Sequence, residues 1–446
     1  MYHRYLAGLA AAGLVALAAC PAPVVAEETA PAAAPAAVDT GDTAWVLAGA
    51  ALVMLMTPGL AFFYGGLVRR KNVLSVLMQC MAILCLMSLQ WVLFGYSLAF
   101  GPDCKGLIGD LAWVGLQGVG AAPNPDYAAT IPHSAFMIFQ AMFAVITPAL
   151  ILGAFAERMR FSAFCLFSVL WATLIYDPVA HWVWGAGGWL RNLGALDFAG
   201  GTVVHINAGL SALACAVFLG KRIGFPGKIS PPHSMPLAVL GAGLLWFGWF
   251  GFNAASALGA NGLAANAFVV THVAAAAAGF AWALLDWFLE RRPTVLGIIT
   301  GAVAGLVAIT PAAGFVTPLG AIGIGTGAAV ICWIFVMVLK AKLGYDDSLD
   351  AFGVHGIGGV WGALATGLWA TKAVNGAGSD GLFHGNAGQM GVQALAVLCT
   401  MAFAFVGTLV LLKVVDALVG LRVTEHEERI GLDLSQHREA GYTLVD

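Results

Sequence analysis

Uncharged apolar segments recur along the chain from Thr43 to Lys413, and short polar or basic connections separate them. Eleven of these segments approach or exceed the ~20 residues that an α-helix needs to cross ~30 Å of hydrocarbon. Since a spanning helix satisfies its backbone hydrogen bonds internally, runs of this length suit helices in lipid. The pattern predicts an all-α membrane protein with eleven transmembrane helices. The predicted spans are 43–67, 73–100, 133–156, 161–185, 199–220, 235–256, 263–286, 294–312, 316–339, 350–371 and 387–413.

The basic residues of the predicted loops lie mainly on one side of the membrane. If the N-terminus is outside, the inside loops carry twelve of them and the outside loops carry three, which are Lys105, Arg191 and Lys372. Cytoplasmic loops are enriched in Lys and Arg, so the distribution predicts an N-out, C-in orientation. The twelve inside residues are Arg69, Arg70, Lys71, Arg158, Arg160, Lys221, Arg222, Lys228, Arg291, Arg292, Lys340 and Lys342.

Composition agrees with this class and excludes a soluble globular protein. Only 10% of the 446 residues are charged, and the mean hydropathy is +0.88, far above that of soluble domains. The net charge of −3 does not indicate a nucleic-acid partner, and none is expected. No CxxC or His/Cys cluster indicates a metal site, so we expect neither metal nor cofactor.

The N-terminus is typical of a secretory signal peptide over residues 1–26, with Arg4, an apolar run and small residues before Ala26. A second interpretation stays open, because Leu17-Ala-Ala-Cys20 also resembles a lipoprotein box cleaved before Cys20. Residues 27–42 are rich in Ala and Pro and predict a disordered linker. The membrane domain then covers 43–419, and a cytoplasmic tail covers 420–446.

Two predicted spans share one polar pattern. In each, an Asp precedes a His by eight residues, Val stands directly before the His, and a Gly follows it by four. Five helices precede the linker 221–234, so helices 1–5 and 6–10 enter the membrane in opposite senses, as in two inverted five-helix repeats followed by a final helix. The matched residues are Asp197, His205 and Gly209 in the first half, and Asp347, His355 and Gly359 in the second.

The two histidines are predicted to meet at mid-membrane. At 1.5 Å per residue, the eight-residue spacing places His205 about 12 Å below the outer face and His355 about 12 Å above the inner face. Ionisable residues inside a span mark functional pathways by default. Two such imidazoles can share a hydrogen bond and pass a proton by exchanging tautomers. The alternative is that each ring separately caps a backbone carbonyl in the bundle.

Aromatic residues of three predicted helices fall at one external depth. Phe139 and Phe143 are i and i+4 on helix 3, Trp184 ends helix 4, and Phe252 and Ser256 are i and i+4 on helix 6. Aromatic faces attract a desolvating cation, and a hydroxyl oxygen can accept an N–H bond from it. Taken singly, an interfacial Trp is more often a lipid-belt residue and a membrane Phe more often packing.

Four segments resemble the Amt/Mep/Rh ammonium transporter family, and its bacterial Amt branch in particular. They are Leu-Asp-Phe-Ala-Gly-Gly-Thr-Val-Val-His-Ile-Asn-Ala-Gly (196–209), Ala-Glu-Arg-Met-Arg-Phe-Ser (156–162), Trp-Phe-Gly-Trp-Phe-Gly-Phe-Asn-Ala-Ala-Ser (246–256) and Phe-Gly-Val-His-Gly (352–356). The resemblance covers about 43–446. It implies an eleven-helix protomer, a homotrimer with one pore per subunit, ammonium as substrate, and an inner-membrane location.

The resemblance also implies roles for individual residues. Phe139, Phe143, Trp184 and Ser256 correspond to an external recruitment site. Phe143 and Phe252 correspond to stacked rings that close the pore, and His205 and His355 to the twin pore histidines. Asp197 corresponds to a buried carboxylate that supports recruitment. The tail from Gly420 to Tyr442 is similar to the family's cytoplasmic tail, which implies contact with a PII-type signalling protein.

These expectations describe an ammonium transporter rather than an enzyme, embedded in membrane lipid. Ammonium is recruited as a cation, loses its proton, and passes as ammonia along the histidines. Whether the proton also crosses stays open. Two other interpretations remain at this stage: an intramembrane redox protein with His205 and His355 as axial haem ligands, and an ammonium sensor with little flux.

Overall fold

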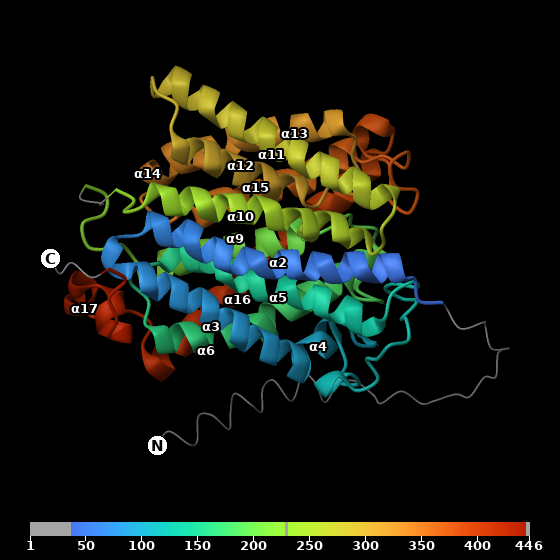
Figure 1. The fold of residues 1–446 in the computed structure, drawn as a ribbon, viewed down its shortest axis with the longest axis horizontal. Helices are drawn as coiled ribbons and strands as arrows, with labels where there is room; N and C mark the ends of the chain where they lie inside the picture. Colours follow the sequence, from blue (N-terminus) through green and yellow to red (C-terminus); the bar gives the residue numbers. More distant parts are fainter. Residues whose placement is uncertain (1–36, 228–230, 443–446) are drawn as a thin grey trace.

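The computed structural model describes residues 37–227 and 231–442. The predicted signal peptide, the predicted linker up to residue 36, Lys228 and the last four residues lie outside these ranges. Within them the chain forms one bundle of long helices whose axes run side by side (Figure 1). The small helix α17 of the C-terminal tail lies at one end of the bundle, at the left of the view.

The helices occupy every predicted range. The first begins at Thr40, so 40–42 of the predicted linker are helical. A two-stranded antiparallel pair, β1 (Asp103–Cys104) and β2 (Ile108–Gly109), lies in the long connection after helix α4. The helices are α2 (Thr40–Leu67), α3 (Val73–Gln90), α4 (Tyr96–Phe100), α5 (His133–Phe155), α6 (Phe161–Trp171), α7 (Asp177–Trp184), α8 (Trp189–Asn192), α9 (Asn207–Leu219), α10 (Met235–Ala254), α11 (Gly262–Leu289), α12 (Val295–Ile309), α13 (Pro318–Trp333), α14 (Lys340–Leu343), α15 (Ile357–Trp369), α16 (Ala387–Val419) and α17 (Glu425–Ile430).

Nine helices of the described residues are long and apolar enough to cross a membrane. The chain therefore forms an all-α membrane protein. The two remaining predicted spans are shorter helices: α12 has 15 residues, and α15 has 13 residues after a five-residue π-helical turn. That all eleven cross the membrane, in the N-out, C-in sense, stays a prediction.

Glycines allow the two histidine-bearing segments to touch backbone to backbone. A Cβ placed on Gly209 would lie 2.1 Å from the amide nitrogen of Gly356. A Cβ on Gly359 would lie 3.0 Å from the Cβ of His205. Small residues at such crossings let helices approach closely in membranes. The Gly that follows each His by four residues thus permits the other half's segment to pack against it.

Candidate functional site

Each histidine lies in a π-helical turn whose amide groups are capped by the matched aspartate. His205 lies in the turn Gly201–Ile206, and His355 in the turn Phe352–Gly356. Such turns expose orphan N–H groups, which a carboxylate can satisfy. Both aspartates are buried and act in this way. The carboxylate of Asp197 accepts hydrogen bonds of 2.6–3.1 Å from the amides of Gly200, Gly201, Thr202 and Val203, and that of Asp347 accepts bonds of 3.1 and 2.7 Å from Ala351 and Phe352.

The two imidazoles are in direct contact. The Nδ1 atoms of His205 and His355 are 3.3 Å apart, and the ring planes are inclined by 18°. Both side chains are buried, with 1% and 4% exposure. In a hydrogen bond of this kind one ring donates and the other accepts. The predicted contact between the rings is therefore present, and neither Nδ1 is used to cap a carbonyl.

A narrow apolar cavity of about 10 Å³ lies beside the pair. Trp249 and Phe252 both stack near His205, with ring centroids 5.4 and 6.0 Å from its own. Nε2 of His205 is buried and has no hydrogen-bond partner among the described residues. An unpartnered ring nitrogen can accept or donate one hydrogen bond to a small guest. The cavity is lined by Met56, Leu60, Phe63, Ile146, Leu150, Val204, His205, Leu245, Trp249, Phe252, Val303 and His355.

Two phenylalanine rings separate this cavity from a second one above it. The ring centroids of Phe143 and Phe252 are 4.3 Å apart, and each side chain is 1% exposed. Phe143 lines the upper cavity and Phe252 the narrow one. The ring planes are inclined by 36°. The two residues that the family resemblance names as a gate thus lie in contact between the two cavities.

The upper cavity has a volume of about 220 Å³ and contains three of the four residues expected to recruit the substrate. Phe143, Trp184 and Ser256 line it, whereas Phe139 does not. Phe139 is fully buried and packs edge-on against Phe143 at 5.0 Å. Phe139 therefore supports the wall from behind. The lining is Phe100, Asp126, Tyr127, Phe136, Gln140, Phe143, Val183, Trp184, Arg191, Phe198, Ser256 and Leu258.

Hydrogen bonds fix the orientation of the Trp184 ring in this cavity and leave one hydroxyl oxygen able to accept. The indole N–H of Trp184 donates to the backbone carbonyl of Asp197 at 2.9 Å, which holds the ring edge-on to Phe143. The Ser256 hydroxyl donates to the carbonyl of Phe252 at 2.8 Å. Since a hydroxyl has one proton and two lone pairs, its oxygen can still accept an N–H bond.

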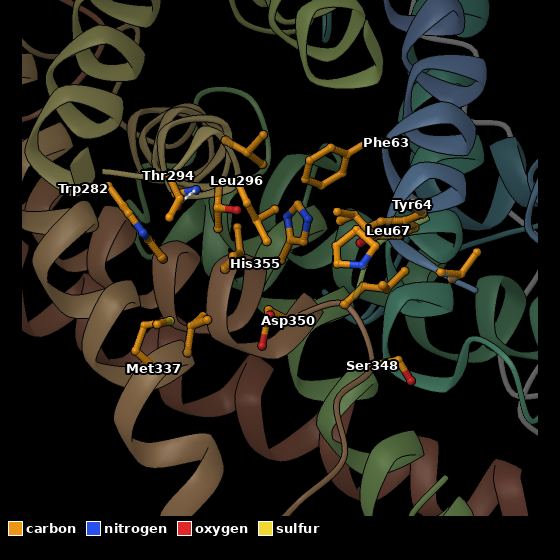
Figure 2. Close-up of a pocket in the computed structure, with 18 of the residues that line it drawn as sticks. Phe63, Tyr64, Leu67, Trp282, Thr294, Leu296, Met337, Ser348, Asp350 and His355 are labelled. Carbon is orange, nitrogen blue, oxygen red and sulfur yellow. Dashed lines mark hydrogen bonds between the residues drawn. The ribbon is translucent and has the colours of Figure 1, made fainter. Parts of the chain in front are cut away.

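Below the histidines, a wider cavity of about 480 Å³ opens at the end of the bundle that carries the tail. Figure 2 shows His355 pointing into it, among Phe63, Tyr64 and Leu67 of α2 and Trp282 of α11. Polar residues such as Thr294, Ser348 and Asp350 also line it. The histidine pair therefore lies between a narrow apolar constriction and a wider chamber whose wall carries some polar and charged groups.

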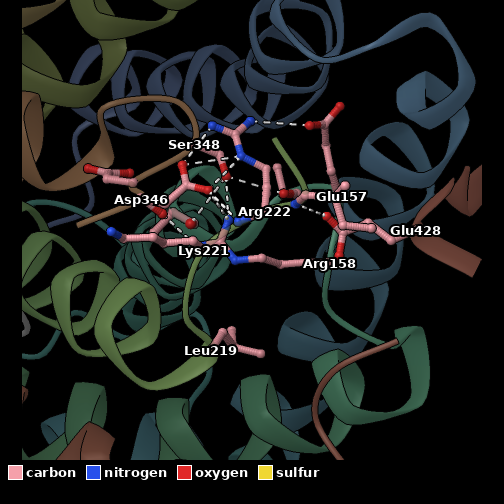
Figure 3. A network of polar contacts seen from close by, with 12 residues as sticks. Glu157, Arg158, Leu219, Lys221, Arg222, Asp346, Ser348 and Glu428 are labelled. Carbon is pink, nitrogen blue, oxygen red and sulfur yellow. Dashed lines mark hydrogen bonds and ion pairs between the residues drawn. The ribbon is translucent and has the colours of Figure 1, made fainter. Parts of the chain in front are cut away.

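A buried ion network fixes the loop that leads to His355 (Figure 3). Arg222 contacts Asp346 at 2.7 Å and Glu157 at 3.2 Å. Arg158 donates to the Asp346 carbonyl at 2.5 Å and to Ser348 at 2.6 Å. Burial alone would raise the pKa of Glu157 and of Asp346, but the arginine partners outweigh it and hold both pKa values below the usual range. Both carboxylates are therefore ionised, and they anchor residues 346–348.

Several site residues had no clear sequence signal. Trp249 was missed although it lies three residues before Phe252, on the same face of α10. On α5 the cavity is lined by Phe136, Gln140 and Phe143, which follow the helical spacing i, i+4, i+7. Phe139 is also at helical spacing from Phe143, so spacing alone does not distinguish the residues that line the cavity from the one that supports its wall.

The geometry also bears on haem ligation. Metal–imidazole bonds are about 2 Å, so an ion between two axial rings separates their nitrogens by about 4 Å. The Nδ1 atoms of His205 and His355 are closer than that, and their planes are nearly parallel. The pair as arranged cannot sandwich a porphyrin.

Together, the fold and site define a polytopic membrane protein in which a ring pair and a histidine pair divide the upper cavity from the wider one below the histidines. In the predicted N-out orientation these are the outer cavity and the inner cavity. Comparison with known proteins makes this class specific. The chain belongs to the ammonium transporter family, whose model, described as Ammonium Transporter Family, matches residues 44–442. An ammonium transporter of Bacillus subtilis (strain 168) is 56% identical over 402 residues, which are 90% of this chain and 98% of that one.

Other relatives agree. Ammonium transporter Amt1 of Archaeoglobus fulgidus is 51% identical over 403 residues, 90% of this chain and 99% of that one. The crystal structure of Saccharomyces cerevisiae Mep2 matches with a TM-score of 0.82 and 37% identity, covering 87% of this chain and 88% of that one. A solved structure named Sensor Amt Protein matches with a TM-score of 0.81 and 31% identity, covering 89% and 98%. Family membership supports ammonium transport by a multi-pass membrane protein.

Proposed function

We propose that the protein captures ammonium as a cation in the outer cavity, removes its proton at the ring gate, and conducts ammonia past His205 and His355 to the inner cavity. The observation that carries this proposal is the Nδ1 contact of 3.3 Å between two buried imidazoles in an apolar constriction. An ammonium ion has a basicity near that of a Lys amine, whose pKa is about 10, so it arrives charged.

The energetics favour deprotonation before passage. Moving an ammonium-sized ion into a medium of low dielectric has an idealised Born cost on the order of 20 kcal/mol. Ammonia avoids most of this cost and can both donate and accept a hydrogen bond. The buried, unpartnered Nε2 of His205 offers it one such bond beneath Phe252. The apolar lining then selects the neutral form, because nothing in it but the two rings can hydrogen-bond strongly.

We also propose the wider setting implied by the family. Eleven helices cross the inner membrane N-out and C-in, as two inverted five-helix repeats and a final helix, and three protomers form a homotrimer with one pore each. The signal peptide 1–26 is removed on export. In support of a PII-type partner, the tail is folded: α17 begins with a capping box at Thr424, and Asn72 accepts a 2.7 Å hydrogen bond from the Leu432 amide.

A second candidate function is ammonium sensing with little flux, favoured by the similarity to the protein named Sensor Amt Protein. Both candidates use the same outer cavity. They differ in whether ammonium bound there goes on to cross the membrane.

Proteoliposome flux decides between them. We expect ammonium-dependent alkalinisation or acidification of the vesicle lumen, measured together with current, in vesicles that contain the wild-type protein. The matched control is a variant that fills the constriction next to the pair, Val204→Trp, which should block flux while leaving ammonium binding in the outer cavity. Binding without flux in the wild type would overturn the transport proposal and favour the sensor.

A further inference from the structure

The outer cavity contains a fixed positive charge that capture of a cation does not require. Arg191 is one of three basic residues on the predicted outer side, and it lines the cavity together with Trp184 and Ser256. Among the described residues it forms no ion pair with a carboxylate. A guanidinium is always charged at physiological pH. Its position next to a cation site therefore needs an explanation.

Arg191 is held in place by backbone carbonyls and an aromatic ring. One terminal nitrogen donates to the carbonyl of Trp184 at 2.9 Å, and the other to the carbonyl of Asp126 at 3.1 Å. The guanidinium carbon lies 5.8 Å from the centre of the Tyr127 ring. The face of the Tyr127 ring, which could otherwise attract a substrate cation, is therefore already in contact with the guanidinium of Arg191. The contacts also tie the end of α7 to the loop before α5.

Asp126 gives the same cavity wall a negative charge. It is exposed and lines the cavity, and its carboxylate has no hydrogen bond or ion pair within the part of the chain that the structure describes. An exposed carboxylate is an oxygen ligand of the kind that Ca²⁺ and Mg²⁺ prefer. Without Arg191, this wall would attract divalent cations into the site that takes ammonium.

We propose that Arg191 is a specificity-determining residue that keeps divalent cations out of the outer cavity. Coulomb repulsion scales with charge, so Arg191 repels a divalent cation twice as strongly as ammonium at equal distance. At separations shorter than the ~8 Å Debye length at physiological ionic strength, salt screens this repulsion only in part. Ammonium compensates through the ring faces and the Ser256 oxygen, whereas a strongly hydrated divalent cation gains less from either. The inference rests on the proposed use of this cavity for capture.

The test measures KM and maximal rate of ammonium uptake in proteoliposomes at constant ionic strength, with and without external Ca²⁺ at about 10 mM. For R191Q we expect a lower KM without Ca²⁺, a rise in KM of about threefold or more on adding it, and an unchanged maximal rate. R191K keeps the positive charge but loses the paired N–H donors of the guanidinium. Its KM should therefore change on adding Ca²⁺ no more than that of the wild type. The double variant R191Q/D126N should regain that resistance.

Three results would overturn the inference: Ca²⁺ resistance in R191Q, Ca²⁺ sensitivity in R191K equal to that of R191Q, or sensitivity that persists in the double variant. If R191Q does not assemble, the D126N variant tests the inference instead. D126N removes the negative charge that offsets the Arg191 guanidinium, so it should raise KM about threefold without changing the maximal rate. An unchanged KM there would refute the inference. Wild-type vesicles that take up no ammonium would instead refute the proposed function.

Discussion

The two histidine segments use the same local device but face different surroundings. Each ring lies in a π-helical turn that begins beside an aspartate cap, and each segment packs against a glycine of the other. His205 lies beneath the paired rings of Phe143 and Phe252, in an apolar constriction of about 10 Å³ that His355 also lines. His355 in addition opens into a wider chamber of about 480 Å³ (Figure 2). The same motif therefore has two settings: we call the His205 side, in the constriction, the sealed side, and the His355 side, at the wide chamber, the open side.

Under the proposed function, the difference predicts where selection occurs. On the sealed side the substrate would meet His205 in an apolar site, where electrostatic effects are large. A residue on the open side can be reached by water from the inner cavity. We therefore expect equivalent substitutions in the two halves to have unequal effects, with the larger effect on the His205 side.

The largest expected effect comes from removing the caps. Asp197→Ala leaves four buried amide groups without partners, at about 1–3 kcal/mol each, whereas Asp347→Ala leaves two. We expect Asp197→Ala to abolish folding or transport and Asp347→Ala to retain part of both. Size-exclusion profiles and uptake by the purified variants measure this. A folded and active Asp197→Ala protein would remove Asp197 from the mechanism.

The next effect concerns charge at the histidine pair. His205→Asp places a carboxylate in the dry constriction, where it stabilises a whole cation and removes the need for deprotonation. We expect this variant to conduct K⁺, which has no proton to lose and which the proposed mechanism predicts the wild type to exclude. His355→Asp should leak less, because the inner cavity hydrates that carboxylate. Growth or current at limiting K⁺, in cells without other K⁺ uptake, measures the leak.

A folded His205→Asp protein that carries ammonium but stays impermeable to K⁺ would count against deprotonation as the basis of selectivity. Loss of all flux would favour a structural role for the ring. His205→Asn is the matched control, since it is similar in size to the Asp variant and uncharged.

Much of this comparison was predictable from sequence, and the reasons are local. The eight-residue spacing from Asp to His and the length of the apolar runs fix where each ring lies along its helix. The depths of the two rings, counted from opposite faces of the membrane, then predicted that His205 and His355 meet. The direction in which a side chain points around its helix axis was not predictable in this way. Phe139 and Phe143 share a helix face by spacing, yet only Phe143 reaches the cavity, because α5 is almost wholly buried and its inner face is set by neighbouring helices.

Contributions from distant loops were also beyond the sequence pattern. Tyr127 reaches the outer cavity from an irregular connection and Arg191 from the four-residue helix α8, and no periodicity of the chain describes the course of either segment. The π-helical turns were likewise not predicted, since they shift the register of the helix by one residue without a compositional signal.

A moderate effect is expected from Trp184→Leu. Trp184 lines the outer cavity on the far side of Phe143 from the histidines, so the proposed mechanism predicts a role in capture and not in passage. A desolvated cation–π contact is worth about 0.5–2 kcal/mol. We expect KM to rise about tenfold with little change in maximal rate. Uptake at low and saturating ammonium separates the two, and unchanged uptake at low ammonium would contradict the assignment of this cavity.

The smallest effect is expected from Ser256→Ala. The hydroxyl oxygen offers the substrate one hydrogen bond, and a single such bond contributes about 0.5–1.5 kcal/mol net, or roughly a threefold rise in KM. The same hydroxyl donates to the Phe252 carbonyl at 2.8 Å, so the Ala variant also loses a contact within its own helix end. Ser256→Thr keeps both bonds and should have a KM close to that of the wild type. If the hydroxyl served only the Phe252 carbonyl, Ser256→Ala would lower thermal stability and leave KM unchanged. Measuring KM and melting temperature on the same preparations therefore distinguishes a substrate ligand in the outer cavity from a contact that only stabilises the end of the helix.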